Sequence, residues 1–338
     1  MKIPFVAFSL LSISVLASCS SSESDEYLSG STMGTSYSVN WTSADDFHDV
    51  ELLQNAIDNR LTRINQLMST YDENSQLSEF NQSREKGWHL VDLELAQLIK
   101  LALEICRQSN GAFDVTIGPL VKLWSLGADD TKFSYPTDSE LSITQQNIGC
   151  QYLDVRLDPP AIYKDRVGLY VDLSAIAKGY GVDQIAKILD EFQLNSYLVE
   201  IGGELKAKGL ATHGEPWRVG IEAPNFGRSN IEEVISLDNH AIATSGDYRD
   251  YTEHEGKQYS HIIDPRSGKP IEHSLTTVTV IHKSAAIADA WATALLVLGP
   301  NRALEIAEQL ELAIFMITRE GIGVKSTFNK KMKPNIAN

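Results

Sequence analysis

The sequence has few cysteines and no excess of basic charge. It contains 3 cysteines in 338 residues, at positions 19, 106 and 150, and their spacing matches no metal-binding pattern. Lysine and arginine total 29 against 45 aspartates and glutamates, which gives a formal net charge of -16. An acidic surface argues against nucleic acid as a partner. An anionic ligand must therefore be held by a local site and not by the overall field.

Two further patterns are missing. No G-x-G-x-x-G motif opens a helix after a strand, so a Rossmann cofactor site is unsupported. Beyond residue 19, no apolar run reaches the length needed to span a membrane. The hydrophobic content of 43% is ordinary for a globular protein, and the chain is long enough to bury a large core.

The first 18 residues predict a lipoprotein signal peptide. One positive charge at Lys2 precedes an almost uncharged apolar run at 3–15, which is too short for a spanning helix. The following Leu-Ala-Ser-Cys resembles a bacterial lipobox, which would make Cys19 the lipid-modified first residue of the mature protein. Residues 1–18 would then be the signal peptide, residues 19–28 a lipidated polar tether, and residues 29–338 the folded domain. An ordinary signal peptide with an incidental cysteine is the alternative.

Helices and strands are mixed without strict alternation, which favours an α+β fold over a doubly wound parallel sheet. Apolar residues at helical spacing predict core-facing helices near 52–68, 95–105, 176–192, 285–298 and 302–310, the first with a stripe of Leu52, Ala56, Leu61, Ile64 and Met68. Strands are expected at 168–173, 197–201, 217–221, 235–237, 276–282, 313–318 and 322–326.

Four polar segments place charged or hydroxyl residues in a small-residue or apolar context, at 111–120, 172–179, 260–268 and 288–293. Burying such groups is costly unless they have partners or a ligand. One such segment is weak evidence, but four together predict a single phosphate-and-metal site that the fold assembles.

The segment at 288–293 supplies the metal hypothesis. Asp289 and Thr293 are four residues apart, so they share one face of the expected helix. A carboxylate and a hydroxyl are hard oxygen ligands suited to Mg²⁺. The alternative is a capping acid plus a core threonine. The many alanines around this pair would let a ligand or another backbone approach closely.

The segment at 172–179 supplies the phosphate hypothesis. A helix N-terminus binds phosphate through its free N–H groups, and Lys178 would add a positive charge. Asp172 could accept a hydrogen bond from a ribose or a ring. The alternative is a capped helix with a solvated lysine. Gly179 and Gly181 cost about 1 kcal/mol each inside a helix, which close packing to a cofactor would explain.

The remaining two segments suggest a base and a ring contact. His261 is a candidate general base. In the segment at 111–120, expected to be extended, Phe113 could pack on a ring and Asp114 could bond to a polar edge. Ordinary loop chemistry is the alternative for both. For Cys106 and Cys150, an exported compartment permits a disulfide, but two buried thiols are equally open because Cys106 sits in a helical pattern.

Ordered motifs along nearly the whole chain resemble those of bacterial FAD:protein FMN transferases, the ApbE family. They are Met-Gly-Thr at 33–35, Met-Ser-Thr-Tyr at 68–71, Gly-Ala-Phe-Asp-Val-Thr at 111–116, Asp-Leu-Ser-Ala-Ile-Ala-Lys-Gly at 172–179, Glu-Ile-Gly-Gly-Glu at 200–204, Pro-Trp-Arg-Val-Gly-Ile-Glu at 216–222, Ala-Thr-Ser-Gly-Asp-Tyr-Arg at 243–249, His-Ile-Ile-Asp-Pro at 261–265 and Ala-Asp-Ala-Trp-Ala-Thr at 288–293.

The resemblance implies an α+β, two-lobed, T-fold-related structure with FAD between the lobes. It implies that FAD is contacted by Met33, Tyr71, Ala112, Phe113, Asp114, Asp172, Lys178 and Ile263. It also implies that Mg²⁺ is held by the backbone oxygens of Ala175 and Ala292 and by the side chains of Asp289 and Thr293.

The activity implied is transfer of the FMN part of FAD to a threonine hydroxyl of a target protein, with release of AMP. The implied targets are flavoprotein subunits of membrane electron-transfer complexes, such as sodium-pumping quinone reductases, at the periplasmic face of the inner membrane. The outer membrane is the alternative location. We expect His261 to accept the threonine proton, Lys178 to neutralise a phosphate oxygen, and Tyr71 to limit access of water. Two alternatives are an FAD diphosphatase and a lipoprotein that binds a small ligand without catalysis.

Overall fold

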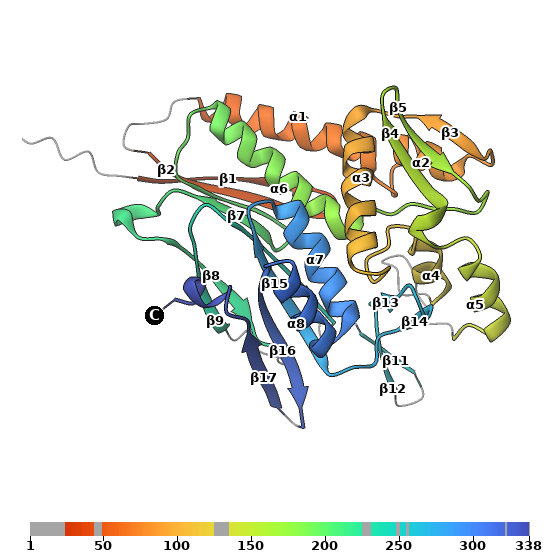
Figure 1. Ribbon diagram of the computed structural model, residues 1–338. Coiled ribbons are helices and arrows are strands. Elements are labelled where there is room, and N and C mark those ends of the chain that lie inside the picture. The colour runs from red at the N-terminus through yellow and green to blue at the C-terminus, as the bar shows by residue number, and fades with distance from the viewer. Residues whose placement is uncertain are drawn as a thin grey trace, which may run out of the picture.

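The computed structural model describes residues 24–43, 49–124, 135–224, 231–247, 251–254, 257–321 and 323–337. Its centre is an antiparallel eight-stranded sheet in the order β1-β2-β6-β7-β10-β15-β16-β17 (Figure 1). The strands are β1 (Ser24–Thr32), β2 (Thr35–Ser43), β6 (Tyr197–Ile201), β7 (Glu204–Lys208), β10 (Ala241–Gly246), β15 (Leu275–His282), β16 (Ala313–Glu320) and β17 (Gly323–Phe328).

Helices cover one face of this sheet, and a hairpin covers part of the other. The covering helices in Figure 1 are α1 (Val50–Met68), α6 (Ser174–Glu191), α7 (Ala285–Leu298) and α8 (Pro300–Gln309). Helix α7 is apolar almost all round, as expected for a helix buried on all sides. On the opposite face, β8 (Trp217–Glu222) and β9 (Ile231–Leu237) pack on apolar residues of β10, β15 and β16.

A smaller part of the molecule lies beside the large sheet, on the right in Figure 1. It contains a three-stranded sheet in the order β3-β5-β4. Its elements are α2 (Gln76–Gln82), β3 (Gly87–Leu90), α3 (Leu93–Gln108), α4 (Gly118–Leu123), α5 (Asp138–Gln145), β4 (Leu153–Leu157) and β5 (Pro160–Lys164). Two short hairpins follow β10, namely β11 (Tyr251–His254) with β12 (Lys257–Ser260), and β13 (Ile263–Asp264) with β14 (Lys269–Pro270). A disulfide between Cys106 and Cys150 joins the end of α3 to the segment before β4.

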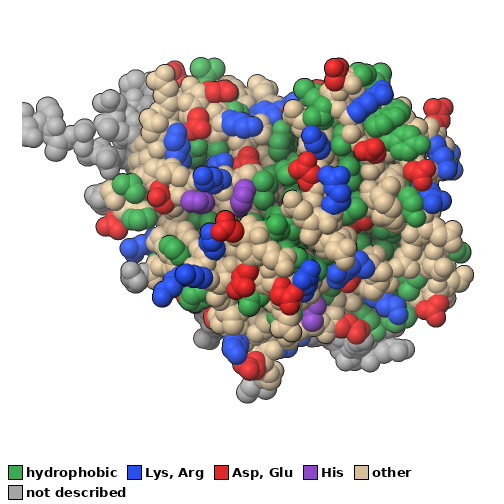
Figure 2. All heavy atoms as spheres, viewed as in Figure 1, with side chains coloured by type: hydrophobic (Ala, Val, Ile, Leu, Met, Phe, Trp, Pro, Cys, Tyr) green, Lys and Arg blue, Asp and Glu red, His purple; other side chains and the backbone are tan. Residues whose placement is uncertain are grey.

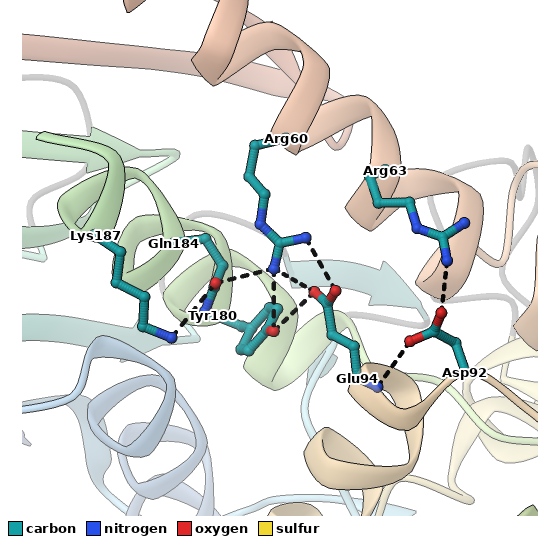
Figure 3. Close-up of polar contacts among 7 residues, drawn as sticks. All are labelled: Arg60, Arg63, Asp92, Glu94, Tyr180, Gln184 and Lys187. Carbon is teal, nitrogen blue, oxygen red and sulfur yellow. Dashed lines mark hydrogen bonds and ion pairs between the residues drawn. The ribbon is translucent and has the colours of Figure 1, made fainter. Parts of the chain in front are cut away.

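An ion pair between α1 and α3 is tied to α6, so three helices meet at one point (Figure 3). Arg60 donates to both carboxylate oxygens of Glu94, at 2.9 and 2.6 Å. Arg60 also donates to Gln184 at 2.9 Å, and the Tyr180 hydroxyl donates to Glu94 at 2.7 Å. A bidentate guanidinium–carboxylate pair is geometrically specific, so this cluster orients α6 against the helices on either side of it.

The predicted α+β class is confirmed, and several predicted elements appear with the expected bounds. The helix expected at 285–298 and the strand expected at 197–201 match α7 and β6. Within the described part of the chain, no helix is both long and apolar enough to cross a bilayer. On the face seen in Figure 2, acidic and basic side chains are interspersed.

Other predictions differ from the structure. Residues 168–173 form no strand, because their backbone bonds go to Asn81 and to the loop at Val115. Residues 111–117 form consecutive turns and are not extended. The buried stripe of α1 contains Leu53 and Ile57, whereas Leu52 is exposed. Strand β1 begins before residue 29, so residues 24–28, expected to be tether, belong to the sheet.

Candidate functional site

Two adjoining cavities receive nearly all of the predicted site residues. The first, of about 290 Å³, is lined among others by Tyr71, Ala112, Phe113, Asp114, Asp172, Ala175, His261, Ile263 and Thr293. The second, of about 170 Å³, is lined among others by Met33, Tyr71, Asp172 and Lys178. The cavities share Tyr71, Asp172 and Ser174. Of the predicted residues that the structure describes, only Asp289 and Ala292 line neither cavity, and both are buried in α7, which contributes Thr293 to the first cavity.

The segment before α6 is held in place by α2. The Asn81 side chain donates to the Val171 carbonyl at 2.8 Å and accepts from the Val171 N–H at 2.7 Å. The carboxylate of the next residue, Asp172, accepts at 2.8 Å from the N–H of Ser174, the first residue of α6. One Asp172 oxygen is thus used by the start of α6, although Leu173, the N-cap residue, makes no side-chain capping bond. Because Asp172 also lines both cavities, it remains available to a ligand.

Helices α6 and α7 pack in very close contact, and this explains Gly179. A Cβ atom built on Gly179 would lie 2.3 Å from the Ala285 carbonyl oxygen and 2.8 Å from the Ala286 nitrogen. The prediction that a cofactor requires this glycine is therefore wrong, since the backbone of α7 occupies the space. A Cβ on Gly181 would instead meet the side chains of Ile201 and Met33.

The same contact brings Asp289 to α6. The Gly179 N–H donates to an Asp289 carboxylate oxygen at 3.0 Å. In a regular α-helix that amide would bond to the carbonyl four residues earlier, which is Ala175. Asp289 thus competes with the Ala175 carbonyl for its helical partner. Beyond it on α7, Thr293 contacts the Ser245 hydroxyl of β10 at 3.0 Å and lines the first cavity together with Ala175.

A cluster of three charges lies beside this contact. The Lys178 ammonium pairs with a Glu204 oxygen at 2.7 Å, while the second Glu204 oxygen is buried and has no hydrogen-bond partner among the described residues. Burial and the nearby Asp289 raise the pKa of Glu204, and burial raises the pKa of Asp289. Burial alone would lower the pKa of Lys178, but the two carboxylates outweigh it and raise that pKa. One ammonium faces two buried carboxyl groups, and their raised pKa values mean that burial disfavours having both ionised unless a further positive charge is present.

This donor set fits a hard divalent cation. Asp289 and Thr293 lie on the α7 face that meets α6, with the Ala175 carbonyl across the contact and oxygen as the only ligand atom type. Oxygen ligands of this kind are those that Mg²⁺ prefers. A divalent cation would also favour the ionised form of the two carboxyl groups, whose pKa values burial raises.

Asp114 is engaged by the protein itself. Its carboxylate accepts from the Thr116 N–H and hydroxyl at 2.8 and 2.7 Å, and from the Cys150 N–H at 3.0 Å. Burial raises the pKa of Asp114 although these bonds oppose it. The carboxylate therefore links the turn at 111–117 to the disulfide. Phe113 is buried and lines the first cavity.

His261 lies at the boundary between a cavity and a groove. It lines the first cavity and also a groove of about 660 Å³ that includes β2, β8 and β10 residues. Burial raises the pKa of the Asp247 carboxyl. The nearby charges of Arg319, His261 and His273 oppose this shift. This position suits a group that moves a proton between a ligand in the cavity and one in the groove.

Tyr71 is exposed at the mouth of the cavities. Its side chain is 74% accessible, and its loop is fixed by the Ser69 hydroxyl, which accepts from the N–H groups of Tyr71 and Asp72 at 3.1 Å each. These bonds fix the backbone of the loop that carries the ring. The aromatic ring can therefore cover a planar ligand without a further cost of ordering the loop.

Sequence reasoning missed three residues of this site. Glu204 and Asp247 lie inside the motifs at 200–204 and 243–249, so the motifs themselves were the available signal. Asn81 belongs to none of the quoted motifs, and only the fold brings it to Val171.

The chain matches the ApbE family over residues 33–316, and it belongs to that family. An FAD:protein FMN transferase of Vibrio cholerae is 40% identical over 325 residues, which cover 96% of this chain and 97% of that protein. An FAD:protein FMN transferase of Escherichia coli is 38% identical over 308 residues, covering 90% and 88%.

Solved structures agree with the family. The flavin transferase ApbE from Vibrio cholerae superposes with a TM-score of 0.85 at 40% identity, covering 93% of this chain and 99% of that one. The apo flavinyl transferase ApbE from Pseudomonas stutzeri also gives 0.85, at 37% identity and 93% and 97% coverage. The fold expected from the resemblance is thus confirmed.

Proposed function

We propose that this protein is an FAD:protein FMN transferase. The observation that carries the proposal is the convergence of the predicted FAD residues, from segments far apart in the sequence, on two adjoining cavities. The names of the similar proteins from Vibrio cholerae and Escherichia coli support the same activity. The cavities have apolar walls that suit a flavin ring, and polar groups near α6 that suit a diphosphate.

In the proposed reaction, a threonine hydroxyl of the target protein attacks the phosphorus atom of the FMN half of FAD. A new P–O bond forms, the P–O bond to the AMP half breaks, and AMP leaves with the bridging oxygen. His261 accepts the proton that the threonine loses. Catalysis of this kind is mainly positioning and charge neutralisation. Lys178 would neutralise a phosphate oxygen, and this requires its ammonium to turn from Glu204 toward the cavity that it lines.

We propose that the protein uses Mg²⁺ held by Asp289, Thr293 and the carbonyls of Ala175 and Ala292. When bound, the cation would stabilise negative charge on the diphosphate. Two features support this assignment. The Gly179 N–H donates to Asp289, which therefore competes with the Ala175 carbonyl for that donor, and two buried carboxyl groups face a single ammonium.

We propose that Cys19 carries a lipid that anchors the protein at the periplasmic face of the inner membrane. Cys19 lies outside the described residues, so its sequence context supports the proposal. The proposed targets are flavoprotein subunits of membrane electron-transfer complexes. These present hydroxyl side chains at the same face, which fits an enzyme that is anchored there.

The test is to mix the soluble chain with FAD, Mg²⁺ and the periplasmic domain of a quinone reductase subunit that carries an acceptor threonine. A band with covalent flavin fluorescence, together with AMP in solution, is expected. Free FMN and AMP without a band would favour FAD hydrolysis, and intact FAD would favour a binding protein.

The variant His261→Ala tests the proton acceptor. We expect a rate of transfer at least about 100-fold lower, the usual scale for a general base, with little change in FAD affinity. A variant that loses affinity and rate equally would contradict the role of His261.

The variant Asp289→Ala tests the metal site. It should abolish Mg²⁺-dependent activity, and full activity would remove Asp289 from the metal site.

A further inference from the structure

The large sheet contains a notch beside β10. The hairpin of β6 and β7 ends at Gly202 and Gly203, and β10 pairs with β7 only at Ala241 and Ile242. On its other side, β10 pairs with β15 along its whole length, to Gly246. The last residues of β10 therefore extend past the end of the neighbouring hairpin.

On the side of this notch, the β10 backbone beyond Ile242 pairs with no strand of the described residues. In an antiparallel ladder, successive residues direct their N–H and C=O groups to alternate sides. The His240 carbonyl accepts from the Ala207 N–H of β7, so Thr244 and Gly246 direct their groups to the same side. No described strand covers this edge beyond Ile242. An open strand edge is a template for pairing with another chain.

The notch opens into the groove already described. The groove is lined by Thr244 and Gly246 of β10, by Thr35 and Ser36 of β2, and by Gly220 of β8. Thr244 and Gly220 are exposed. At Gly203, a Cβ atom would meet no described atom within 4 Å, so a second backbone has room to approach there. The lining of the groove is mostly polar, so the groove does not suit the apolar face of a helix.

His261 connects this groove to the cavity with the predicted FAD residues, because it lines both. The two spaces belong to opposite faces of the sheet. The side chain of Ser245 reaches Thr293 on the α7 face, so its neighbours Thr244 and Gly246 face the β8 side. A hydroxyl group that enters the groove can thus reach, beside His261, a phosphorus atom that is held in the cavity on the α7 side.

We infer that the groove binds the acceptor polypeptide, which adds to the free edge of β10 as an extended strand and presents its hydroxyl residue to His261. This inference rests on the proposed transferase function and names how its protein substrate is bound. Main-chain hydrogen bonds to Thr244 and Gly246 would supply affinity and fix the register, as in other cases of strand addition. Register then decides which hydroxyl reaches the phosphorus.

The first experiment compares Thr244→Trp with Thr244→Ser. The indole fills the groove, whereas serine keeps the hydroxyl that contacts Thr279 at 2.9 Å. The probe is the periplasmic domain of a flavinylated quinone reductase subunit. With Thr244→Trp we expect KM for this domain to rise at least about tenfold, equivalent to roughly 1.4 kcal/mol, with unchanged Kd for FAD. With Thr244→Ser we expect wild-type values.

The second experiment measures amide hydrogen exchange in the wild-type enzyme. The same domain, with its acceptor threonine replaced by valine so that no transfer occurs, is added at saturating concentration. The amides of Thr244 and Gly246 should become protected. An unchanged KM in Thr244→Trp, or binding without protection of these amides, would overturn the inference while wild-type flavinylation upholds the transferase. Failure of the wild-type enzyme to flavinylate any acceptor would overturn the proposed function and this inference with it.

Discussion

The contact between α6 and α7 predicts a large effect of the substitution Gly179→Ala. The new Cβ would lie 2.3 Å from the Ala285 oxygen, and real Cβ atoms essentially never approach within 3.0 Å, so the helices must separate by at least about 0.7 Å. Every near atom is backbone, so no side chain can rotate away. The hydrogen bond from the Gly179 N–H to Asp289, now 3.0 Å, would lengthen beyond bonding range.

Two magnitudes follow from this separation. Overpacking against rigid backbone should cost about 2–3 kcal/mol, the upper part of the usual range, which exceeds the roughly 1 kcal/mol that alanine gains over glycine in a helix. The separation also moves Asp289 and Thr293 away from Ala175, and misplacement of about 1 Å typically costs on the order of 100-fold in rate. We therefore expect a lower free energy of unfolding in urea and a kcat for flavin transfer reduced about 100-fold.

The matched control is Gly181→Ala, two residues later in the same helix. Its Cβ would meet the ends of flexible side chains, Ile201 Cδ1 at 2.8 Å and Met33 Cε at 3.1 Å. We expect unchanged or slightly higher stability, because those ends can move and helix propensity improves. Equal stability and kcat in wild type and Gly179→Ala, or equal damage from both substitutions, would refute the reasoning.

Three further predictions concern stability. Reduction of the Cys106–Cys150 disulfide, which spans 44 residues, should lower the free energy of unfolding by about 4 kcal/mol on the chain-entropy scale, measured in urea with and without reductant. Asn81→Ala removes both side-chain bonds to Val171 and should cost about 2–4 kcal/mol at 1–2 kcal/mol per bond; a loss below about 0.5 kcal/mol would contradict this. Because the pKa of Glu204 is raised from 4.5 to about 8 in the fold, its contribution to stability is present below 4.5 and lost as pH rises through about 8. Wild type should therefore lose stability relative to Glu204→Gln over this window without Mg²⁺, and parallel pH profiles would refute the shift.

Local signals in the sequence were enough to predict the most regular elements. The helix at 285–298 has Ser284 as a capping residue and Gly299 beyond its last turn, and these set both ends of α7. Neighbouring leucines left the rotation of α1 ambiguous. Leu52 and Leu53 both continue an apolar series, and only packing against the core selects Leu53.

Features set by distant partners could not be predicted in the same way. Strand β1 is rich in serine and has few apolar residues, so its strand character comes from pairing with β2. The extended run at 168–173 looks like a strand, but the side chain of Asn81 and the loop at Val115 take its backbone bonds. The disulfide depends on how α3 meets the segment before β4, which sequence spacing does not encode.

For the site residues too, the sequence predicted what local motifs encode but not what depends on distant partners. Motifs placed Asp289, Thr293 and Lys178 in one site, and the structure brings their segments together. The motifs could not show that Gly179 serves helix packing, because that depends on where the backbone of α7 lies. The close contact, and not the composition of either helix, sets the distance between the proposed metal ligands.

The proposed lipid anchor would give strand β1 a second role, because the strand would then set how far from a bilayer the enzyme can act. If Cys19 carries the proposed lipid, the chain from there to Ser24 spans at most about 18 Å when fully stretched. From Ser24 the strand runs about 27 Å to Thr32, and the next residue, Met33, lines the second cavity. Strand β1 then acts as a rigid spacer that holds the active site at a limited height above the lipid surface. With that anchor, acceptor segments within this height would be in reach of the enzyme, and segments on domains that project farther would have to approach the lipid surface to meet it.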